Sequence, residues 1–319
     1  MKPPSESLSD DALVRLAQAA SRPEVPGGRY EVLEKVGAGG MGTVYRARDL
    51  PLAREVALKV VHDTRAPAAL AARLCAEART VAALEHSSIP PVYEIGELAD
   101  GRAFYVMRFV HGATLARAER RSLNASLRLF LRLCEAVAHA HGKGVVHRDL
   151  KPENVMLGAH GELYVMDWGL AGALEQVGHA DDSARAAAGT PGFMAPEQER
   201  PGSAPIDARA DVYALGGILA FLATGRGPDR GGELDLGAVP RPLAAVIARA
   251  RRPEPEARYP SALELARDVA ATLDREPVSA YREGPLERAG RFLVKHQFVV
   301  WLVVGYLTLR ALVFFFSGR

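Results

Sequence analysis

This chain of 319 residues has only two cysteines, little excess charge and a single long hydrophobic run. Cys75 and Cys134 lie in helical patterns rich in Ala, Leu and Arg, so we expect two small core residues in a reducing compartment rather than a disulfide framework. The formal net charge of +2 lacks the basic excess of nucleic-acid binders, and no nucleic-acid partner is expected. The N-terminus is acidic where a signal peptide needs a basic and then an apolar stretch.

Hydrophobic residues make up 48% of the chain, which is enough for a sizeable core. Apolar residues alternate from Tyr30 to Val61 and again in PPVYEIGEL and AFYVMRFV, which predicts antiparallel strands. Helical spacing is found over residues 66–84, 126–141, 210–224, 243–250 and 261–273. A small strand-rich half followed by a larger helical half predicts an α+β protein of two lobes with a cleft between them.

A glycine-rich motif, GAGGMGTV, lies between two predicted strands. There the backbone at Gly37, Gly39 and Gly42 can approach a phosphate closely. Dinucleotide-binding folds use the same spacing, but their last glycine opens a helix, whereas TVYRARD continues here as a strand. By itself, the motif also fits a glycine-rich hairpin turn.

Lys59 in VALKV has aliphatic neighbours on both sides. Such a lysine usually lies at an edge, with its ammonium group in water. If it points inward it needs an anion, and either a carboxylate or a phosphate would serve. Glu77 in the following helix is the candidate carboxylate, and Glu85 near the end of that helix is the alternative.

The most informative segment is HRDLKPENVML, followed by GAHGELYVMDWG. VML and LYVM are predicted to be two strands of a hairpin, joined by a turn over 158–161. The hairpin brings Asn154 close to Asp167, and two neighbouring oxygen ligands suit Mg²⁺. In the preceding loop, Asp149 can accept a proton from a hydroxyl and Lys151 can neutralise a phosphate in transfer. A merely solvated loop does not account for this set.

These motifs, with GTPGFMAPE over 189–197, occur in the order found in protein kinases. Over residues 29–275 the chain resembles the bacterial Ser/Thr protein kinases of eukaryotic type, the Hanks-type kinases. The resemblance implies a β-rich N-lobe over 29–110 and a larger helical C-lobe over 111–275, after a flexible extension over 1–28. It also implies transfer of the γ-phosphate of ATP to Ser/Thr hydroxyls of protein substrates, with autophosphorylation.

The resemblance assigns a role to each motif residue. The three glycines would cover the phosphates, and Lys59, paired with Glu77, would hold the α- and β-phosphates. Asn154 and Asp167 would hold Mg²⁺ or Mn²⁺. Asp149 would orient and deprotonate the acceptor hydroxyl while Lys151 stabilises the γ-phosphate. The residues expected around the adenine are Val36, Val44, Ala57 and Leu157, with Met107 as gatekeeper and Phe109 and Val110 as the hinge.

Other matches to the family are expected to be structural. They are an ion pair of Glu197 with Arg258, Asp211 as a brace of the HRD loop, and His147 as a scaffold residue. The chain also departs from the family pattern. Trp168 replaces a phenylalanine, Arg108 stands where relatives carry an acidic residue, and the stretch over 224–240 is short and Gly-rich, which leaves substrate or partner docking there undecided.

An arginine before the catalytic aspartate usually neutralises a phosphate on the following loop. Between Asp167 and Glu197 only Ser183 and Thr190 carry hydroxyls. We hypothesise that Ser183 is an autophosphorylation site, or that Asp181 and Asp182 substitute for its charge; an unregulated loop is the third alternative. Thr190 is expected to line the substrate site beside Asp149.

The hydrophobic run occupies residues 297–317, after a polar linker over 276–296. At about 1.5 Å per residue its length matches a bilayer core of about 30 Å, which predicts one transmembrane helix. Arg310 interrupts the run near its far end, where it can snorkel toward the headgroups; a buried terminal helix or a peripheral anchor is the alternative. Basic residues on the near side predict a cytoplasmic kinase domain at the cell membrane.

Two alternative hypotheses assign the chain to other functional classes. A membrane-anchored pseudokinase would bind nucleotide or a partner without phosphoryl transfer, but its usual mark is a missing catalytic residue, and here all are present. A membrane adaptor without a nucleotide site would leave the glycine motif and the metal hairpin unexplained. The family resemblance also allows a homodimer, although no sequence feature requires one.

Overall fold

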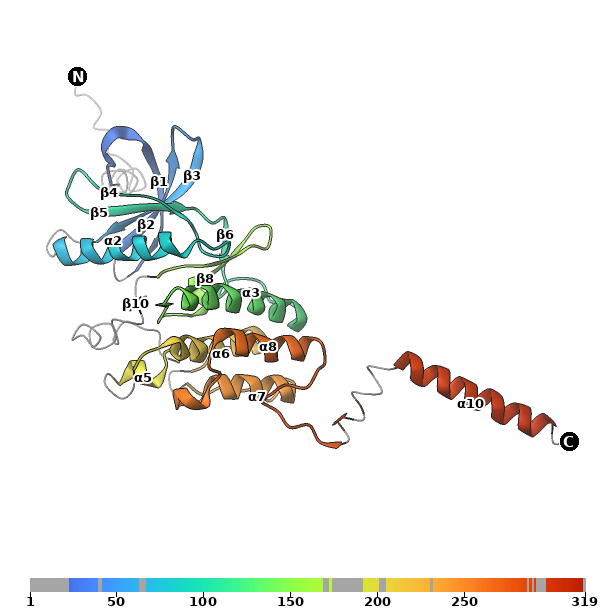
Figure 1. Cartoon of the computed structure of the whole chain (residues 1–319). Coiled ribbons are helices and arrows are strands. Elements are labelled where there is room, and N and C mark those ends of the chain that lie inside the picture. Colours follow the sequence, from blue (N-terminus) through green and yellow to red (C-terminus); the bar gives the residue numbers. More distant parts are fainter. Residues whose placement is uncertain are drawn as a thin grey trace, which may run out of the picture.

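A computed structural model of the chain shows two lobes and a separate C-terminal helix (Figure 1). The structure describes residues 23–39, 42–62, 67–168, 172–173, 192–200, 205–229, 232–285, 287–288, 290 and 297–317. The first lobe is built on a β-sheet and the second is mostly helical, so the predicted division into a strand-rich and a helical half is confirmed.

The first lobe contains a five-stranded antiparallel sheet in the order β1-β2-β3-β5-β4. It is preceded by a short 3₁₀ turn, η1. Alternation along the strands divides the apolar residues between two buried clusters, and helix α2 packs on one face of the sheet. The elements of this lobe are η1 Pro26–Gly28, β1 Tyr30–Ala38, β2 Gly42–Asp49, β3 Arg54–Val61, α2 Pro67–Leu84, β4 Val92–Glu97 and β5 Ala103–Arg108.

The predicted hairpin is confirmed as β8 and β9, which pair antiparallel. The short strand β6 adds to β8, and this three-stranded sheet lies at the junction of the lobes, while β7 pairs with β10 (Figure 1). The elements at this junction are β6 Gly112–Thr114, β7 Val145–Val146, η2 Pro152–Asn154, β8 Val155–Gly158, β9 Leu163–Val165 and β10 Gly172–Ala173.

The second lobe is a set of helices around one large apolar core. Side-chain caps start three of them: Ser122, Asp207 and Ser261 each accept a hydrogen bond from a backbone N–H in the first turn. The four helices predicted here are confirmed as α3, α6, α7 and α8. The elements of this lobe are α3 Leu123–Gly142, α5 Pro196–Glu199, α6 Ala208–Thr224, α7 Arg241–Ala250, η4 Pro255–Ala257 and α8 Ala262–Leu273.

The two cysteines are unpaired thiols, as expected. Cys134 is buried in the helical core, but Cys75 on α2 is only half-buried. The prediction that both are core residues is therefore right for Cys134 and wrong for Cys75.

The connection between α6 and α7 is short. Within its described residues, 225–229 and 232–240, there is no helix. Gly225, in the left-handed conformation at φ 76°, ends α6 and turns the chain. The short, Gly-rich stretch over 224–240 thus corresponds to an irregular connection on the surface of the helical lobe.

The chain remains attached to the second lobe beyond α8. Asp268 on α8 is buried and accepts hydrogen bonds from the Tyr259 hydroxyl at 2.7 Å, from the Ser279 N–H at 2.8 Å and from the Ser279 hydroxyl at 2.7 Å. Val278, next to this anchor, is buried as well. The Asp268 carboxylate is thus one anchor of the segment just after α8.

Acid is expected to weaken this anchor. Burial acts to raise the pKa of the Asp268 carboxyl, but the hydrogen bonds from Ser279 and Tyr259 hold it below its ordinary value of 3.8. A carboxyl whose pKa is lower in the folded state stabilises the fold above the unfolded value and loses that contribution as the pH falls through the folded value. The difference in unfolding free energy between wild type and Asp268→Asn should therefore stay constant from about pH 7 to about pH 5 and shrink as the pH falls below the ordinary value of 3.8 toward the lower folded value.

Urea unfolding at a series of pH values measures this difference. Asp274→Asn, at an exposed carboxyl just after α8, is the matched control. A difference for Asp268→Asn that stays constant in acid would contradict the role given to the Asp268 carboxylate.

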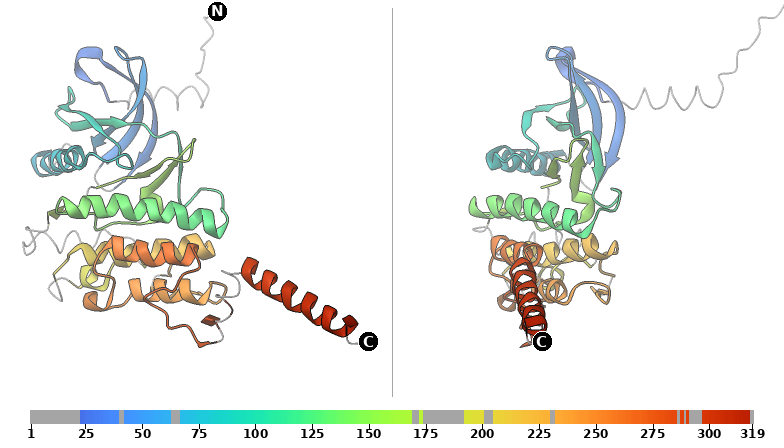
Figure 2. Two further views of the ribbon diagram at one scale, coloured as in Figure 1. Left: turned by 45° about the vertical axis from the view of Figure 1, so that its right-hand side comes forward. Right: turned by 90° about the vertical axis from the view of Figure 1, so that its right-hand side faces the viewer.

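The last helix, α10 (Gln297–Ser317), extends away from the second lobe (Figures 1 and 2). Large apolar side chains along it are exposed, among them Phe298, Trp301 and Tyr306. Within the part of the chain that the structure describes, however, no helix has both the length and the apolar character that crossing a membrane requires. The prediction of a transmembrane helix over 297–317 is therefore not supported.

Candidate active site

A buried lysine connects the sheet of the first lobe to α2. The Lys59 ammonium on β3 donates to Glu77 Oε1 at 2.7 Å, and the Tyr105 hydroxyl donates to the same oxygen at 2.8 Å. Lys59 and Tyr105 face each other in register across β3 and β5. Glu85 lies just beyond α2 and is exposed, so the structure selects Glu77 over Glu85 as the carboxylate.

The charge of Lys59 is well stabilised. Burial acts to lower the pKa of the ammonium group, but the neighbouring Tyr105, Glu77 and Asp167 outweigh burial and hold the pKa above its ordinary value. Tyr105, which sequence reasoning missed, is a second hydrogen-bond donor to Glu77. Its only sequence signal is its place in a strand of alternating apolar residues.

Replacing Glu77 with glutamine removes the countercharge of Lys59 and keeps the shape of the side chain. Because hydrogen bonds to charged groups are stronger than neutral ones, we expect kcat/KM for ATP to fall about ten- to a hundredfold. Steady-state kinetics with varied ATP measures the effect. Glu85→Gln, the alternative carboxylate, is the control and should leave kcat/KM unchanged; an equal loss in both variants would contradict the pairing.

The lysine also reaches the far end of the β8–β9 hairpin. Lys59 Nζ donates to Asp167 Oδ1 at 3.1 Å, although the two residues are 108 positions apart in the chain. Burial acts to raise the pKa of the Asp167 carboxyl, but Lys59, together with His147 and Lys151, outweighs burial and holds the pKa below its ordinary value. Asp167 has a positive φ of 56°, a strained backbone typical of functional positions.

The two predicted metal ligands lie at one end of this hairpin. Asn154 immediately precedes β8 and Asp167 follows β9, and the N–H of Met166 donates to the carbonyl of Asn154 at 2.8 Å. An amide oxygen and a carboxylate oxygen are hard ligands of the kind that Mg²⁺ takes, and half of the Asp167 side-chain surface is exposed. The described residues contain no group of three or more His, Cys, Asp or Glu side chains able to hold a metal. A cation here would therefore need further ligands, such as phosphate oxygens and water.

Asp149 and Lys151 form a compact pair in the loop before the hairpin. Lys151 Nζ donates to Asp149 Oδ2 at 2.8 Å, and Asn154 Nδ2 donates to the same oxygen at 3.0 Å. The Asn154 amide also donates to the carbonyl of Asp149 at 2.8 Å. Its nitrogen is thus used to hold the loop, which leaves its oxygen for a cation.

The loop that carries Asp149 and Lys151 is held by Asp211 on α6. The Asp211 carboxylate accepts from the N–H of His147 at 2.8 Å and of Arg148 at 2.9 Å, and His141 lies 2.7 Å from it. Arg148 has a φ of 68°, a conformation that needs such support. Burial acts to raise the pKa of Asp211, but the contact with His141 and the backbone donors hold it below its ordinary value. The expected bracing role is confirmed by these contacts.

The two departures nearest the site are accommodated by local contacts. Trp168 is buried, its indole N–H donates to the Val165 carbonyl at 3.1 Å, and its ring contacts that of His147 with centroids 4.6 Å apart. His147 is itself fully buried, as a scaffold residue should be. Arg108 at the end of β5 donates to the Tyr164 hydroxyl at 3.1 Å.

Most of the residues predicted around the adenine are brought together. Ala57 and Met107 are buried neighbours across β3 and β5, and Val44 and Phe109 pack against the same cluster. Val110 and Leu157 are buried outside this cluster, Leu157 in the core of the second lobe. Val36 on β1, by contrast, is 46% exposed and is not part of this cluster. The cluster also includes Met166, which sequence reasoning missed; its place next to Asp167 was the available signal.

The three motif glycines differ in whether packing leaves room for a side chain. A Cβ on Gly42 would lie 2.3 Å from the carbonyl oxygen of Val60, so glycine is needed there for β2 to pair with β3. A Cβ on Gly37 or Gly39 would meet no described atom within 4 Å. Packing among the described residues therefore does not require glycine at these two positions, and their approach to a phosphate stays a prediction.

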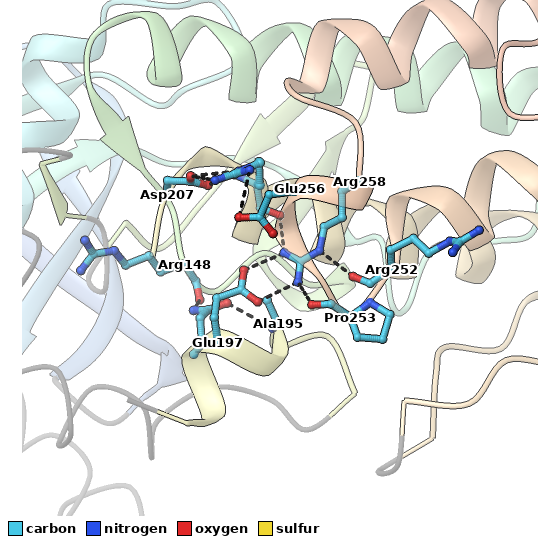
Figure 3. Close-up of polar contacts among 10 residues, drawn as sticks. Arg148, Ala195, Glu197, Asp207, Arg252, Pro253, Glu256 and Arg258 are labelled. Atoms are coloured by element: carbon cyan, nitrogen blue, oxygen red, sulfur yellow. Dashed lines mark hydrogen bonds and ion pairs between the residues drawn. The ribbon is translucent and has the colours of Figure 1, made fainter. Parts of the chain in front are cut away.

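The predicted ion pair of Glu197 and Arg258 is confirmed and is fully buried (Figure 3). Two guanidinium N–H groups donate to the two Glu197 oxygens at 2.6 and 2.7 Å. The guanidinium also donates to the carbonyls of Arg252 at 2.7 Å and Pro253 at 2.9 Å. The pair ties α5 to the segment before α8. Ser183 and Thr190, with Asp181 and Asp182, lie outside the described residues.

Comparison with known proteins agrees with this geometry. The protein kinase domain family matches residues 30–262. Serine/threonine-protein kinase PknB of Mycobacterium tuberculosis is 35% identical over 277 residues, which covers 79% of this chain and 44% of that protein. DNA damage-responsive serine/threonine-protein kinase RqkA of Deinococcus radiodurans is 42% identical over 207 residues, covering 63% of this chain and 30% of the relative.

A third relative, serine/threonine-protein kinase PknD of Protochlamydia amoebophila, is 33% identical over 291 residues, covering 75% of this chain and 29% of that protein. The chain thus spans between 29% and 44% of the length of these relatives. Since the family match includes both lobes and every site residue described above, this chain belongs to the protein kinase family.

Proposed function

We propose that this chain is a serine/threonine protein kinase that transfers the γ-phosphate of ATP to Ser/Thr hydroxyls of proteins, its own included. The observation that carries the proposal is the position of Lys59, whose ammonium lies 2.7 Å from Glu77 and 3.1 Å from Asp167. One cation thus joins the sheet that would hold the nucleotide to the hairpin that would hold the metal.

In the proposed reaction, the acceptor hydroxyl oxygen attacks the γ-phosphorus of ATP, the bond between that phosphorus and the bridging β–γ oxygen breaks, and ADP leaves. Asp149 orients the hydroxyl and takes its proton. Lys151, 2.8 Å from Asp149, balances charge on the phosphate in transfer. Positioning and electrostatics supply most of the catalysis in such reactions.

ATP and a divalent cation, Mg²⁺ or Mn²⁺, are the proposed cofactors. Lys59 would bind the α- and β-phosphates, and Asn154 and Asp167 would hold the cation. When bound, the cation would neutralise charge on the phosphate oxygens. Ala57, Val44, Met107 and Leu157 would surround the adenine, and the backbone at Phe109 and Val110 would serve as the hinge.

The choice of Ser/Thr over Tyr rests on Lys151 together with the GTPGF sequence that precedes APE. The resemblance to Ser/Thr kinases lies in the HRDLKPEN loop. Each of the three relatives compared above is named a serine/threonine-protein kinase. The lysine would lie beside a short acceptor side chain that must reach Asp149. Protein substrates are therefore proposed to be phosphorylated at serine or threonine.

The test is transfer from γ-labelled ATP by the full chain to a generic basic protein, with and without Mg²⁺, followed by phosphoamino-acid analysis. Label on serine or threonine that depends on Mg²⁺ supports the proposal. Binding of Mg-ATP without any transfer would favour the pseudokinase alternative. Absence of nucleotide binding would overturn the site assignment itself.

Membrane attachment is a separate proposal and rests on the sequence of residues 297–317 together with the basic residues Arg288, Arg291 and Lys295. We propose a cell-membrane location with the kinase domain on the cytoplasmic side. Carbonate extraction of membranes tests this: release of the intact chain would refute a spanning segment. A homodimer stays a prediction from the family resemblance.

A further inference from the structure

One histidine outside the family motifs contacts the glycine-rich loop. His62 is the first residue after β3 and its ring is exposed. Its Nε2 lies 2.8 Å from the carbonyl oxygen of Gly39, and its Nδ1 lies 3.2 Å from the hydroxyl oxygen of Thr43. One imidazole therefore joins the end of β3 to both sides of the loop between β1 and β2.

The sheet register brings the ring to this place. Gly42 pairs with Val61 and Thr43 pairs with Val60, so the loop returns into β2 directly beside the end of β3. The absence of a side chain on Gly42 permits this approach, since a Cβ there would lie 2.3 Å from the Val60 carbonyl oxygen. Because β2 pairs closely with β3, the ring of His62, the residue after β3, lies within hydrogen-bond distance of Gly39.

Both backbone polar groups of Gly39 are used. Its N–H donates to the carbonyl of Gly42 at 2.9 Å, and its carbonyl is the group that contacts His62. Gly39 has no side chain to restrict its backbone, and a glycine loses more conformational freedom on ordering than any other residue. These two hydrogen bonds therefore hold the backbone on both sides of the Gly39 Cα, one through its N–H and one through its carbonyl.

The chemistry of the ring fits this contact. A carbonyl oxygen can only accept, so Nε2 must carry a proton and donate to Gly39. In the neutral ring, Nδ1 then accepts from the Thr43 hydroxyl, and in the protonated ring Nδ1 donates to it, because a hydroxyl can take either role. Thr43 is itself buried, which gives the ring a fixed partner on its other side.

We propose that His62 is a positioning residue of the nucleotide site, which holds the Gly39 carbonyl and so pre-organises the backbone at the described motif glycines Gly39 and Gly42 for the phosphates of ATP. The inference rests on the proposed function, because it takes the ligand of the loop to be a nucleoside triphosphate. His62 acts through Gly39 and does not touch the reacting atoms. Its contribution lies in the affinity for ATP rather than in the transfer step.

The test compares the full chain with the variants His62→Ala and His62→Gln. Loss of one hydrogen bond to the loop should raise the Kd for Mg-ATP and the KM for ATP about three- to tenfold, with kcat nearly unchanged. The glutamine amide nitrogen reaches about as far as Nε2 and should recover most of the affinity. His160→Ala, an exposed histidine in the turn between β8 and β9, is the matched control and should bind as wild type does.

Isothermal titration with Mg-ATP and steady-state kinetics supply the two readouts. Equal Kd and KM values in wild type and His62→Ala would overturn the inference while leaving the proposed function intact. A fall in kcat without a change in KM would also overturn it, because a loop that only binds the nucleotide should not act on the transfer step alone. If wild type itself does not bind Mg-ATP, the proposed function fails and this inference fails with it.

Discussion

Replacing Asp149 with asparagine is expected to lower the rate of phosphoryl transfer about 10²–10⁴-fold, the usual contribution of a general base. Asparagine has the same shape and can still be held by Lys151 and Asn154, which contact Asp149 Oδ2 at 2.8 and 3.0 Å. Its amide cannot accept the proton of the attacking hydroxyl. The change therefore removes the proposed chemistry and keeps the loop in place.

The loss should appear in kcat and not in nucleotide affinity, because the nucleotide is proposed to be held by Lys59, Asp167 and Asn154. Transfer from γ-labelled ATP measures kcat, and isothermal titration measures the Kd for Mg-ATP. Asp100→Asn, in the exposed turn between β4 and β5, is the matched control with unchanged activity. An Asp149→Asn variant that keeps more than about a tenth of the wild-type rate would contradict the assignment.

Replacing Glu197 with glutamine should produce the largest loss of stability, about 3–5 kcal/mol in the free energy of unfolding. The side chains of Glu197 and Arg258 are 3% and 0% exposed, and they meet through two hydrogen bonds. An arginine cannot lose its proton inside a protein. The variant therefore leaves a buried cation facing a neutral amide, with only backbone carbonyls as further partners.

Urea unfolding measures this loss as a lower midpoint. Glu199→Gln is the matched control, because Glu199 lies on the same short helix, α5, and is exposed; substitutions at such surface positions usually change stability by about 0.5 kcal/mol or less. Equal midpoints for the two variants would show that the ion pair does not support the fold. The described contacts of Glu197 are with Arg258 and not with the proposed nucleotide residues, so any change in nucleotide affinity should follow from unfolding alone.

Features that depend on neighbouring residues were predictable from the sequence. The strands from Tyr30 to Val61 follow from alternation of apolar residues, which reports on the face that each side chain occupies. The hairpin of β8 and β9 follows from two short apolar runs joined by a turn. Since a hairpin brings its two ends together, the sequence also predicted that Asn154 and Asp167 lie at one end. The choice of Glu77 over Glu85 was predicted from position along a helix in the same local way.

Other contacts depend on how distant elements pack. Nothing in the pattern around Lys59 indicates that it reaches Asp167, 108 positions away, or that Tyr105 donates to Glu77. Met166 beside the adenine cluster, the Asp268 anchor and the contact of His62 with Gly39 were missed for the same reason. Val36 is 46% exposed, and its place beside the adenine stays a prediction.

The sequence by itself therefore determined the order of strands and helices, the hairpin and the identity of the residues able to bind phosphate, metal and a proton. The tertiary structure decided which of these side chains meet, and which glycine is required by packing rather than by a ligand. The physical reason is that periodicity and turn chemistry act within a few residues, whereas the meeting of Lys59 with Asp167 depends on the packing of the two lobes against each other.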